Sequence, residues 1–181
     1  MRRALFLDRD GVINVDGHYI HRPEEFHFVD GIFELCRAAA DKDYLLIVVT
    51  NQSGIARGMY SEADFLKLTD WMRARFREEG VLISEVYFCP YHPKDGIGAY
   101  RQDSYDRKPH PGRILKAKDE FDIDLSRSII IGDKDSDMEA GRRAQVGKLC
   151  LLAGEYPYQT AEDVTVLDSL QAGVSILLGG V

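Results

Sequence analysis

The sequence predicts a doubly wound, three-layer α/β fold on a parallel sheet, and two observations favour this class. Apolar runs alternate along the chain with stretches of helical periodicity, which is the order of repeated strand–helix units. Most of the apolar runs are nearly continuous, as expected for parallel strands covered on both faces. No repeat, low-complexity tract or linker divides the 181 residues. We therefore expect a single domain over residues 1–181.

Five apolar runs are predicted to be strands, and helical periodicity predicts five helices. The strands are expected at 3–8, 45–50, 85–89, 128–132 and 147–152, and the helices at 31–42, 62–79, 111–121, 135–145 and 168–178. Asp30 is placed to cap the first helix, and Ser61 with Asp64 resembles a capping box for the second. Pro111 suits the first turn of the third helix. The longest irregular stretch, 90–110, is rich in Pro, Gly and polar residues, and such loops are usually functional.

Composition and charge limit the function classes. The net charge is −7, from 23 Lys and Arg against 30 Asp and Glu, which argues against general binding to nucleic acid or an anionic membrane. The three cysteines, Cys36, Cys89 and Cys150, are widely spaced and suggest no disulfide framework. Only four apolar residues separate the basic start from Asp8, too few for a signal peptide or a membrane span. We expect a cytosolic protein.

Polar residues that carry chemistry follow the predicted strands. Asp8 and Asp10 end the first apolar run, Thr50 ends the second, and Asp133 follows the run 129–132. Lys108 lies in the irregular stretch. Open α/β folds place their ligand sites at the carboxyl ends of the strands, so we expect these residues to share a pocket. Together they predict a phosphotransfer site.

The residue types predict the role of each group. Asp8 is our candidate nucleophile, since an ionised carboxylate can attack phosphorus and give an acyl phosphate. An anion that attacks an anion needs charge neutralisation, which implies Mg²⁺ on Asp8 and Asp133. Asp10 contributes either its carboxylate or its backbone carbonyl to the metal. Asp137, one turn into the next helix, is expected to orient the metal's waters or Lys108 from the second ligand shell.

The remaining roles concern protons and phosphoryl oxygens. Asp10 is our candidate general acid and base, which typically contributes roughly 10²–10⁴-fold to the rate. The Thr50 hydroxyl and the backbone N–H groups after it can hold the phosphoryl oxygens. Lys108 supplies a positive charge to the same oxygens, and Arg107 can grip a further oxyanion.

These segments resemble the four motifs of the haloacid dehalogenase superfamily of aspartyl-phosphate phosphatases. Residues 8–14, 50–58, 89–93 and 107–112 further resemble the branch of the D-glycero-D-manno-heptose-1,7-bisphosphate 7-phosphatases, which includes the phosphatase domain of histidinol-phosphate phosphatase. The resemblance covers about residues 3 to 152. It implies a Rossmann-like sheet of order 5-4-1-2-3, with Asp8 as nucleophile, Asp10 as acid and base, and Lys108 as phosphoryl stabiliser.

The resemblance also implies the ligands. Mg²⁺ is expected on Asp8, Asp10 and Asp133. The expected substrate is a small sugar phosphate, and its contacts are Asp16, Gly17, His18, Tyr19, Thr50, Asn51, Gln52, Ser53, Arg107 and Lys134. In this branch the product feeds lipopolysaccharide-core or S-layer synthesis in a bacterial cytoplasm. We expect a monomer that binds neither nucleic acid nor a membrane.

The long loop departs from the branch. There it commonly binds zinc through a Cys-x-His pair and a Cys-x-Cys pair, whereas the matching residues here are Cys89, Tyr91, Ser104 and Asp106. A structural zinc site needs four good ligands, so we expect no zinc, even with His92 available beside Cys89. We expect proline residues and the packing of three tyrosines to fix the loop instead: Tyr91, Tyr100 and Tyr105.

Spacing predicts an open site. Only about 40 residues separate Asp8 from Thr50, and a helix and a strand use most of them, so no large cap domain fits there or before Lys108. The segments 14–24 and 90–106 then form the rims, where His18, Tyr19, His21, Tyr91 and His92 are candidates for sugar contacts as well as ordinary surface residues.

The residues alone leave three alternative functions open. A histidinol-phosphate phosphatase is the nearest alternative to a sugar-bisphosphate phosphatase. A phospho-accepting signalling domain also uses an Asp, a Thr and a Lys on a parallel sheet, but it lacks an acid or base two residues after the nucleophile, where Asp10 lies. A polynucleotide-end phosphatase fits poorly with the acidic balance.

Overall fold

The structure is a computed structural model that describes residues 1–178, and its strands form one parallel sheet of six. The strands are β1 (Arg3–Leu7), β2 (Tyr44–Asn51), β3 (Ile83–Cys89), β4 (Ile129–Gly132), β5 (Lys148–Leu152) and β6 (Val164–Leu167). Their order is β3-β2-β1-β4-β5-β6. Read from the opposite edge, this confirms the predicted order of the first five strands. The sixth strand pairs with β5 and was not predicted.

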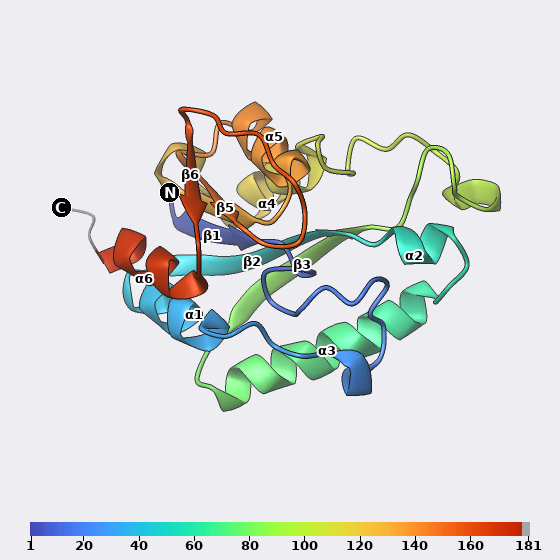
Figure 1. The fold of residues 1–181 in the computed structure, drawn as a ribbon, viewed down its shortest axis with the longest axis horizontal. Coiled ribbons are helices and arrows are strands. Elements are labelled where there is room, and N and C mark those ends of the chain that lie inside the picture. Colours follow the sequence, from blue (N-terminus) through green and yellow to red (C-terminus); the bar gives the residue numbers. More distant parts are fainter. Residues whose placement is uncertain (179–181) are drawn as a thin grey trace.

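Helices cover both faces of the sheet, as Figure 1 shows. On one face lie α1 (Ile32–Asp41), α3 (Glu62–Glu78) and α6 (Leu170–Leu178), and on the other lie α4 (Gly112–Phe121) and α5 (Asp135–Arg143). The short helix α2 (Ser53–Ala56) follows β2, and 3₁₀ turns occur at Pro23–Glu25, Gly98–Tyr100 and Leu125–Arg127. The three-layer α/β class is confirmed. Neither the connection from β1 to β2 nor that from β2 to α4 contains a large cap domain.

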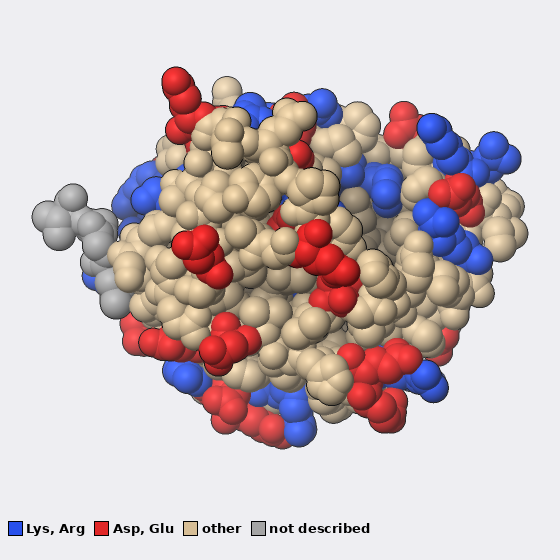
Figure 2. All heavy atoms as spheres, viewed as in Figure 1, with Lys and Arg blue, Asp and Glu red and all other residues tan. Residues whose placement is uncertain are grey.

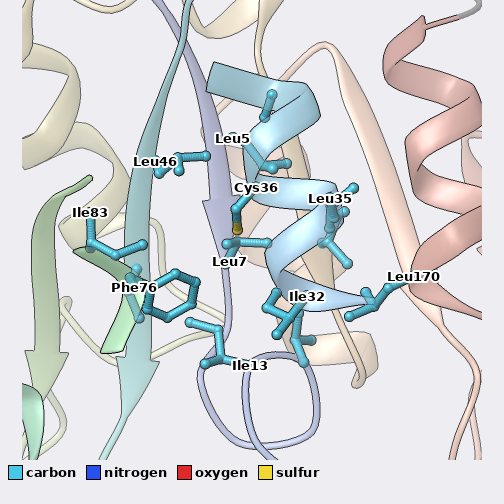
Figure 3. Close-up of a cluster of buried hydrophobic side chains, with 14 of the residues drawn as sticks. Leu5, Leu7, Ile13, Ile32, Leu35, Cys36, Leu46, Phe76, Ile83 and Leu170 are labelled. Carbon is cyan, nitrogen blue, oxygen red and sulfur yellow. The ribbon is translucent and has the colours of Figure 1, made fainter. Parts of the chain in front are cut away.

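The central strands are buried on both faces because successive side chains point to opposite sides. In β1, Leu5 and Leu7 join the core beneath α1 and α3, whereas Ala4 and Phe6 join the core beneath α4 and α5. Figure 3 shows the first of these cores, in which Phe76 of α3 and Cys36 of α1 pack beside Leu7. This packing holds β1, and therefore Asp8 after it, in a fixed place.

Of the caps predicted for the first two helices, one is confirmed and one is wrong. Ser61 and Asp64 form the expected capping box, since each side chain accepts a hydrogen bond from the backbone N–H of the other. The prediction for Asp30 was wrong, because Gly31 is the N-cap of α1, with φ 86°. The Asp30 carboxylate instead accepts a hydrogen bond from Gln171 at the start of α6.

Figure 2 shows acidic and basic side chains interspersed over the face in view. No helix within residues 1–178 combines the length and the apolar character needed to cross a lipid bilayer.

Candidate active site

The predicted motifs meet at the carboxyl edge of the three central strands. In the register, Leu7 of β1 pairs with Val48 of β2 and with Ile131 of β4. Asp8 follows Leu7 directly, and its backbone N–H donates to the Ile131 carbonyl at 3.1 Å. The chain order reverses between β1 and β4, and this is the switch point at which open α/β sheets bind ligands.

Lys108 lies buried between two carboxylates. Its Nζ is 3.1 Å from Asp8 Oδ1 and 2.6 Å from Asp137 Oδ1, and it donates a hydrogen bond to the Val49 carbonyl at 2.7 Å. Burial alone lowers the pKa of Lys108, but Asp137 and Asp8 outweigh burial and raise it. The side chain is therefore a permanent, fixed positive charge beside Asp8.

Asp137 is held through both of its carboxylate oxygens. Oδ1 pairs with Lys108, while Oδ2 accepts the backbone N–H groups of Asp133 and Lys134, each at 3.1 Å. Gly132 leaves room for this contact, since a Cβ there would lie 2.2 Å from the Asp137 Cβ. Asp137 thus orients Lys108 and the turn that carries Asp133.

Asp8, Asp133 and Asp137 form a carboxylate cluster that suits a divalent cation. One potential ligand atom from each lies within 4.8 Å of the others. Burial, followed by the neighbouring carboxylates, raises the pKa of Asp8 to about 6 and that of Asp133 to about 8. Asp133 Oδ1 is buried without a hydrogen-bond partner. Among residues 1–178, Lys108 is the one ammonium in an ion pair with these three carboxylates, so their negative charge exceeds the positive charge beside them. Carboxylate oxygens are the ligands that Mg²⁺ prefers.

Asp10 lies outside that cluster and faces a different set of donors. Its Oδ1 accepts hydrogen bonds from Arg9 Nη2 at 2.8 Å and Asn14 Nδ2 at 3.0 Å, and its Oδ2 accepts one from Gln52 Nε2 at 3.0 Å. Arg9 is itself buried, with its guanidinium over the ring of Phe26. The carboxylate of Asp10 is therefore oriented from three sides and is free of the Lys108 ion pairs.

Gln52 links Asp10 to two hydroxyl groups. Its Nε2 also donates to Thr50 Oγ1 at 2.9 Å, and its Oε1 accepts from the Tyr60 hydroxyl at 2.5 Å. Burial raises the pKa of Tyr60, so this phenol remains a proton donor. Tyr60 was not predicted, because a lone tyrosine eight residues after Gln52 belongs to no motif.

A cavity of about 150 Å³ opens above this network. Asp10 lines it, as do Gly54, Tyr60 and Tyr156, which were not predicted. The lining also contains most of the predicted substrate contacts: Asp16, His18, Tyr19, Asn51, Gln52, Ser53 and Lys134. Three predicted contacts do not line it: Gly17, Thr50 and Arg107. Arg107 is half-buried in the long loop, where its Nη1 lies 3.5 Å from the Tyr91 carbonyl and burial lowers its pKa.

Tyr156 comes from the loop after β5, where no sequence motif marked a function. Its hydroxyl donates a hydrogen bond to Asp16 Oδ2 at 2.7 Å, and Lys134 Nζ lies 4.3 Å from the centre of its ring. Burial alone raises the pKa of Asp16, but the hydrogen bonds from Tyr156 and from the His18 backbone outweigh it and lower the pKa.

The long loop is held by an ion pair to helix α4 and by packing of its own aromatic rings. Cys89 is buried, and burial raises its thiol pKa. Asp106 pairs with Arg113 at 3.4 Å. The rings of Tyr91 and Tyr100 are 6.1 Å apart, as expected from packing. Tyr105 is 59% exposed, and its ring lies 5.9 Å from that of His110.

A HAD-hydrolase-like family model matches residues 105–172, which include Lys108, Asp133 and Asp137. The chain is 57% identical to a D-glycero-alpha-D-manno-heptose-1,7-bisphosphate 7-phosphatase of Burkholderia mallei, over 83% of this chain and 79% of that one. It is 46% identical to a D-glycero-beta-D-manno-heptose-1,7-bisphosphate 7-phosphatase of Vibrio cholerae, over 93% of this chain and 92% of that one.

A solved structure shares the fold along the whole chain. The D,D-heptose 1,7-bisphosphate phosphatase of B. bronchiseptica, crystallised with magnesium and phosphate, superposes with a TM-score of 0.83 at 27% identity. The alignment covers 99% of each chain.

Proposed function

Since the chain belongs to the haloacid dehalogenase-like hydrolases, in the family of the D-glycero-D-manno-heptose-1,7-bisphosphate 7-phosphatases, we propose that it removes the 7-phosphate of that bisphosphate in a Mg²⁺-dependent reaction. It is a phosphatase, and we propose that it acts through an aspartyl-phosphate intermediate on Asp8. The single observation that carries this mechanism is the buried Lys108 ammonium between Asp8 and Asp137, next to the unpartnered oxygen of Asp133.

In the proposed first step, an Asp8 carboxylate oxygen attacks phosphorus, and the bond from phosphorus to the sugar oxygen breaks. Lys108 is fixed beside Asp8 and stabilises the negative charge of the phosphoryl oxygens. Thr50 adds a hydroxyl at the end of β2. Asp10 gives a proton to the leaving sugar oxygen, and in the second step it takes a proton from the water that cleaves the acyl phosphate.

The magnesium site is supported by the donor set. Asp8 and Asp133 would hold the ion, with Asp137 fixing the turn behind them, while Asp10 would contribute its backbone carbonyl because its carboxylate is engaged elsewhere. When bound, Mg²⁺ neutralises the charge of the attacking and transferred groups. We propose no zinc in the 90–106 loop, since Asp106 pairs with Arg113 and Cys89 is buried beside Ser104.

The substrate is proposed from the relatives and from the cavity. The alpha-named relative is 57% identical and the beta-named one 46%, which supports the alpha anomer as the preferred substrate. Asp16, His18, Tyr19 and Lys134 would contact the sugar and its second phosphate, because they line the cavity next to Asp10. We further propose Arg107 and Gly17 as rim contacts, and a monomer that acts in the bacterial cytoplasm, in lipopolysaccharide or related sugar synthesis.

The test is phosphate release from a panel of substrates, with and without Mg²⁺ and after chelation. We expect the highest kcat/KM for the alpha anomer of heptose 1,7-bisphosphate, with the beta anomer and histidinol phosphate as comparisons, and loss of activity with EDTA that Mg²⁺ restores. A higher kcat/KM for histidinol phosphate, or full activity in EDTA, would contradict the proposal. Metal analysis of the purified protein tests the absence of zinc.

A further inference from the structure

Tyr156 connects two loops at the mouth of the active-site cavity. It lies in the loop between β5 and β6 (Figure 1), which returns over the carboxyl edge of the sheet. The loop is anchored there twice, by the bond from the Tyr156 hydroxyl to Asp16 Oδ2 at 2.7 Å and by the Gln159 N–H, 3.2 Å from both carboxylate oxygens of Asp135. The side chain of Tyr156 is thus a fixed wall of the cavity that also contains Asp10.

The aromatic ring of Tyr156 also positions the ammonium of Lys134. Lys134 Nζ lies 4.3 Å from the ring centre, a distance at which a cation is attracted to the face of an aromatic ring. Among the described residues that line this cavity, Lys134 is the one lysine or arginine. An anionic group of a ligand that enters the cavity would therefore depend on this ammonium.

Asp16 can compete with an anionic group of the ligand for the Lys134 ammonium. It lines the same cavity and accepts a hydrogen bond from the hydroxyl of the ring that Lys134 lies over, so the two opposite charges both contact Tyr156. The charge of Lys134 also contributes to lowering the pKa of Asp16. Both oxygens of Asp16 are occupied, Oδ1 by the His18 N–H at 3.0 Å and Oδ2 by the Tyr156 hydroxyl. If the hydroxyl were absent, Oδ2 would be free to pair with Lys134 and neutralise it.

We propose that Tyr156 is a positioning residue for the second, non-reacting phosphate of the substrate. Its hydroxyl satisfies Asp16 and its ring holds Lys134, so that the ammonium stays available to the distal anion. This inference rests on the proposed function only in that the ligand is a sugar with two phosphates. The role differs from catalysis, because the contacts of Tyr156 are with Asp16 and Lys134, which take no part in the proposed transfer of the phosphoryl group or of protons.

The test compares Tyr156→Phe with the wild-type protein on two substrates. One is heptose 1,7-bisphosphate and the other is p-nitrophenyl phosphate, which has no distal anion. We expect KM for the bisphosphate to rise roughly tenfold with kcat changed by less than about twofold, and both constants for p-nitrophenyl phosphate to stay unchanged. Tyr158→Phe, two residues along the same loop, is the matched control and should leave all constants unchanged. Equal changes on both substrates, or none on either, would overturn the proposal.

A double-mutant cycle tests the route through Lys134. In the Lys134→Met background, Tyr156→Phe should have little further effect on KM for the bisphosphate, because there is no ammonium left to capture. Additive effects would overturn the proposal. Thermal unfolding of each variant shows whether the loop stays in place, and a fall in Tm that accompanies equal losses on both substrates would indicate a structural role only.

Inhibition by the bisphosphate distinguishes the role of Tyr156 from the substrate assignment. The Ki of the bisphosphate against p-nitrophenyl phosphate hydrolysis is measured in each protein. If the wild-type protein binds the bisphosphate without hydrolysing it, the proposed function fails, while a roughly tenfold higher Ki in Tyr156→Phe still supports the role of Tyr156. If the bisphosphate does not inhibit the wild-type protein, both proposals are contradicted.

Discussion

Asn51 and Lys108 are joined by two reciprocal hydrogen bonds. The Lys108 N–H donates to Asn51 Oδ1 at 3.0 Å, and Asn51 Nδ2 donates to the Lys108 carbonyl at 3.1 Å. The pair fastens the end of the long loop to the end of β2. Lys108 has no helix or strand of its own, so this amide holds its backbone at the position from which its ammonium reaches Asp8.

Asn51→Leu should therefore reduce turnover without touching a catalytic group. Losing both hydrogen bonds leaves the Lys108 backbone unsatisfied and lets the ammonium drift from Asp8, and we expect kcat to fall by roughly ten- to a hundredfold. Steady-state kinetics measure the effect. Gln102→Leu, which removes an exposed amide from the same loop, is the control and should be neutral. An Asn51→Leu protein with unchanged kcat would show that Lys108 is positioned by other contacts.

Gly11→Ala should weaken metal binding. Gly11 has φ +91°, and an added Cβ would lie 2.0 Å from Asp133 Oδ2, so the carboxylate must move. We expect Mg²⁺ affinity, measured by calorimetry, to fall at least roughly tenfold and activity to fall with it.

Gly80→Ala provides the matched control for Gly11→Ala. Gly80 has a similar positive φ of +76°, with no atom within 4 Å of an added Cβ. It should lose some stability, by about 1 kcal/mol, and keep its metal affinity. Equal metal affinity in the two variants would exclude the contact with Asp133 as the cause.

The metal-free protein should become less stable as the pH rises from 5.5 to 8. Burial and neighbouring charges raise the pKa of Asp133 from 3.8 to about 8, so the folded state holds a proton that the unfolded state has already lost. The folded state then binds more protons across this window, and the free energy of unfolding falls as the pH rises. We expect a drop in Tm of at least about 3 °C, measured by calorimetry in EDTA.

Mg²⁺ should reverse this trend, because it replaces the proton in the carboxylate cluster. The rise in Tm on adding Mg²⁺ should be larger at pH 8 than at pH 5.5. Asp133→Asn, which cannot titrate, should have a flatter Tm profile and a smaller response to Mg²⁺. A Tm of the metal-free protein that increases between pH 5.5 and 8 would contradict the raised pKa of the cluster.

Gln52→Leu should lower kcat more than it raises KM. Gln52 Nε2 reaches both Asp10 and Thr50, and the leucine would leave their oxygens misaligned, so we expect kcat to fall roughly tenfold or more. Tyr60→Phe removes only the contact behind Gln52 and should have a smaller effect in the same direction. Substrate-dependence curves separate kcat from KM, and an effect on KM alone would assign Gln52 to substrate binding instead.

The sequence predicted the sheet well because its strands are long apolar runs. Leu45 to Val49 is buried throughout, and such a run has few alternatives to a central strand. β6 was missed for the opposite reason: it has four residues, lies at the edge, and exposes Thr165 and Val166. The prediction of one domain over 1–181 stays a prediction, and it is supported by the single sheet that contains all described strands.

The sequence predicted the site residues that directly follow strands. It did not predict the residues that only the tertiary fold brings to the site. Asp8 and Asp133 meet because adjacent parallel strands end together, which strand positions alone imply. Tyr156 reaches Asp16 across 140 positions of sequence, and its loop carries no pattern that indicates where it folds back. Asn51 was predicted to contact substrate, and its amide is bonded to the Lys108 backbone, a pairing that sequence spacing cannot reveal.

Transient phosphorylation of Asp8 is tested most directly by acid quenching of a single turnover with substrate labelled at the 7-phosphate. We expect the label to appear, within the first turnover, on the peptide that contains Asp8, and we expect Asp8→Asn to lose both the label and at least about 10⁴-fold in kcat. Label on any other residue, or an Asp8→Asn protein that keeps the wild-type rate, would contradict the account.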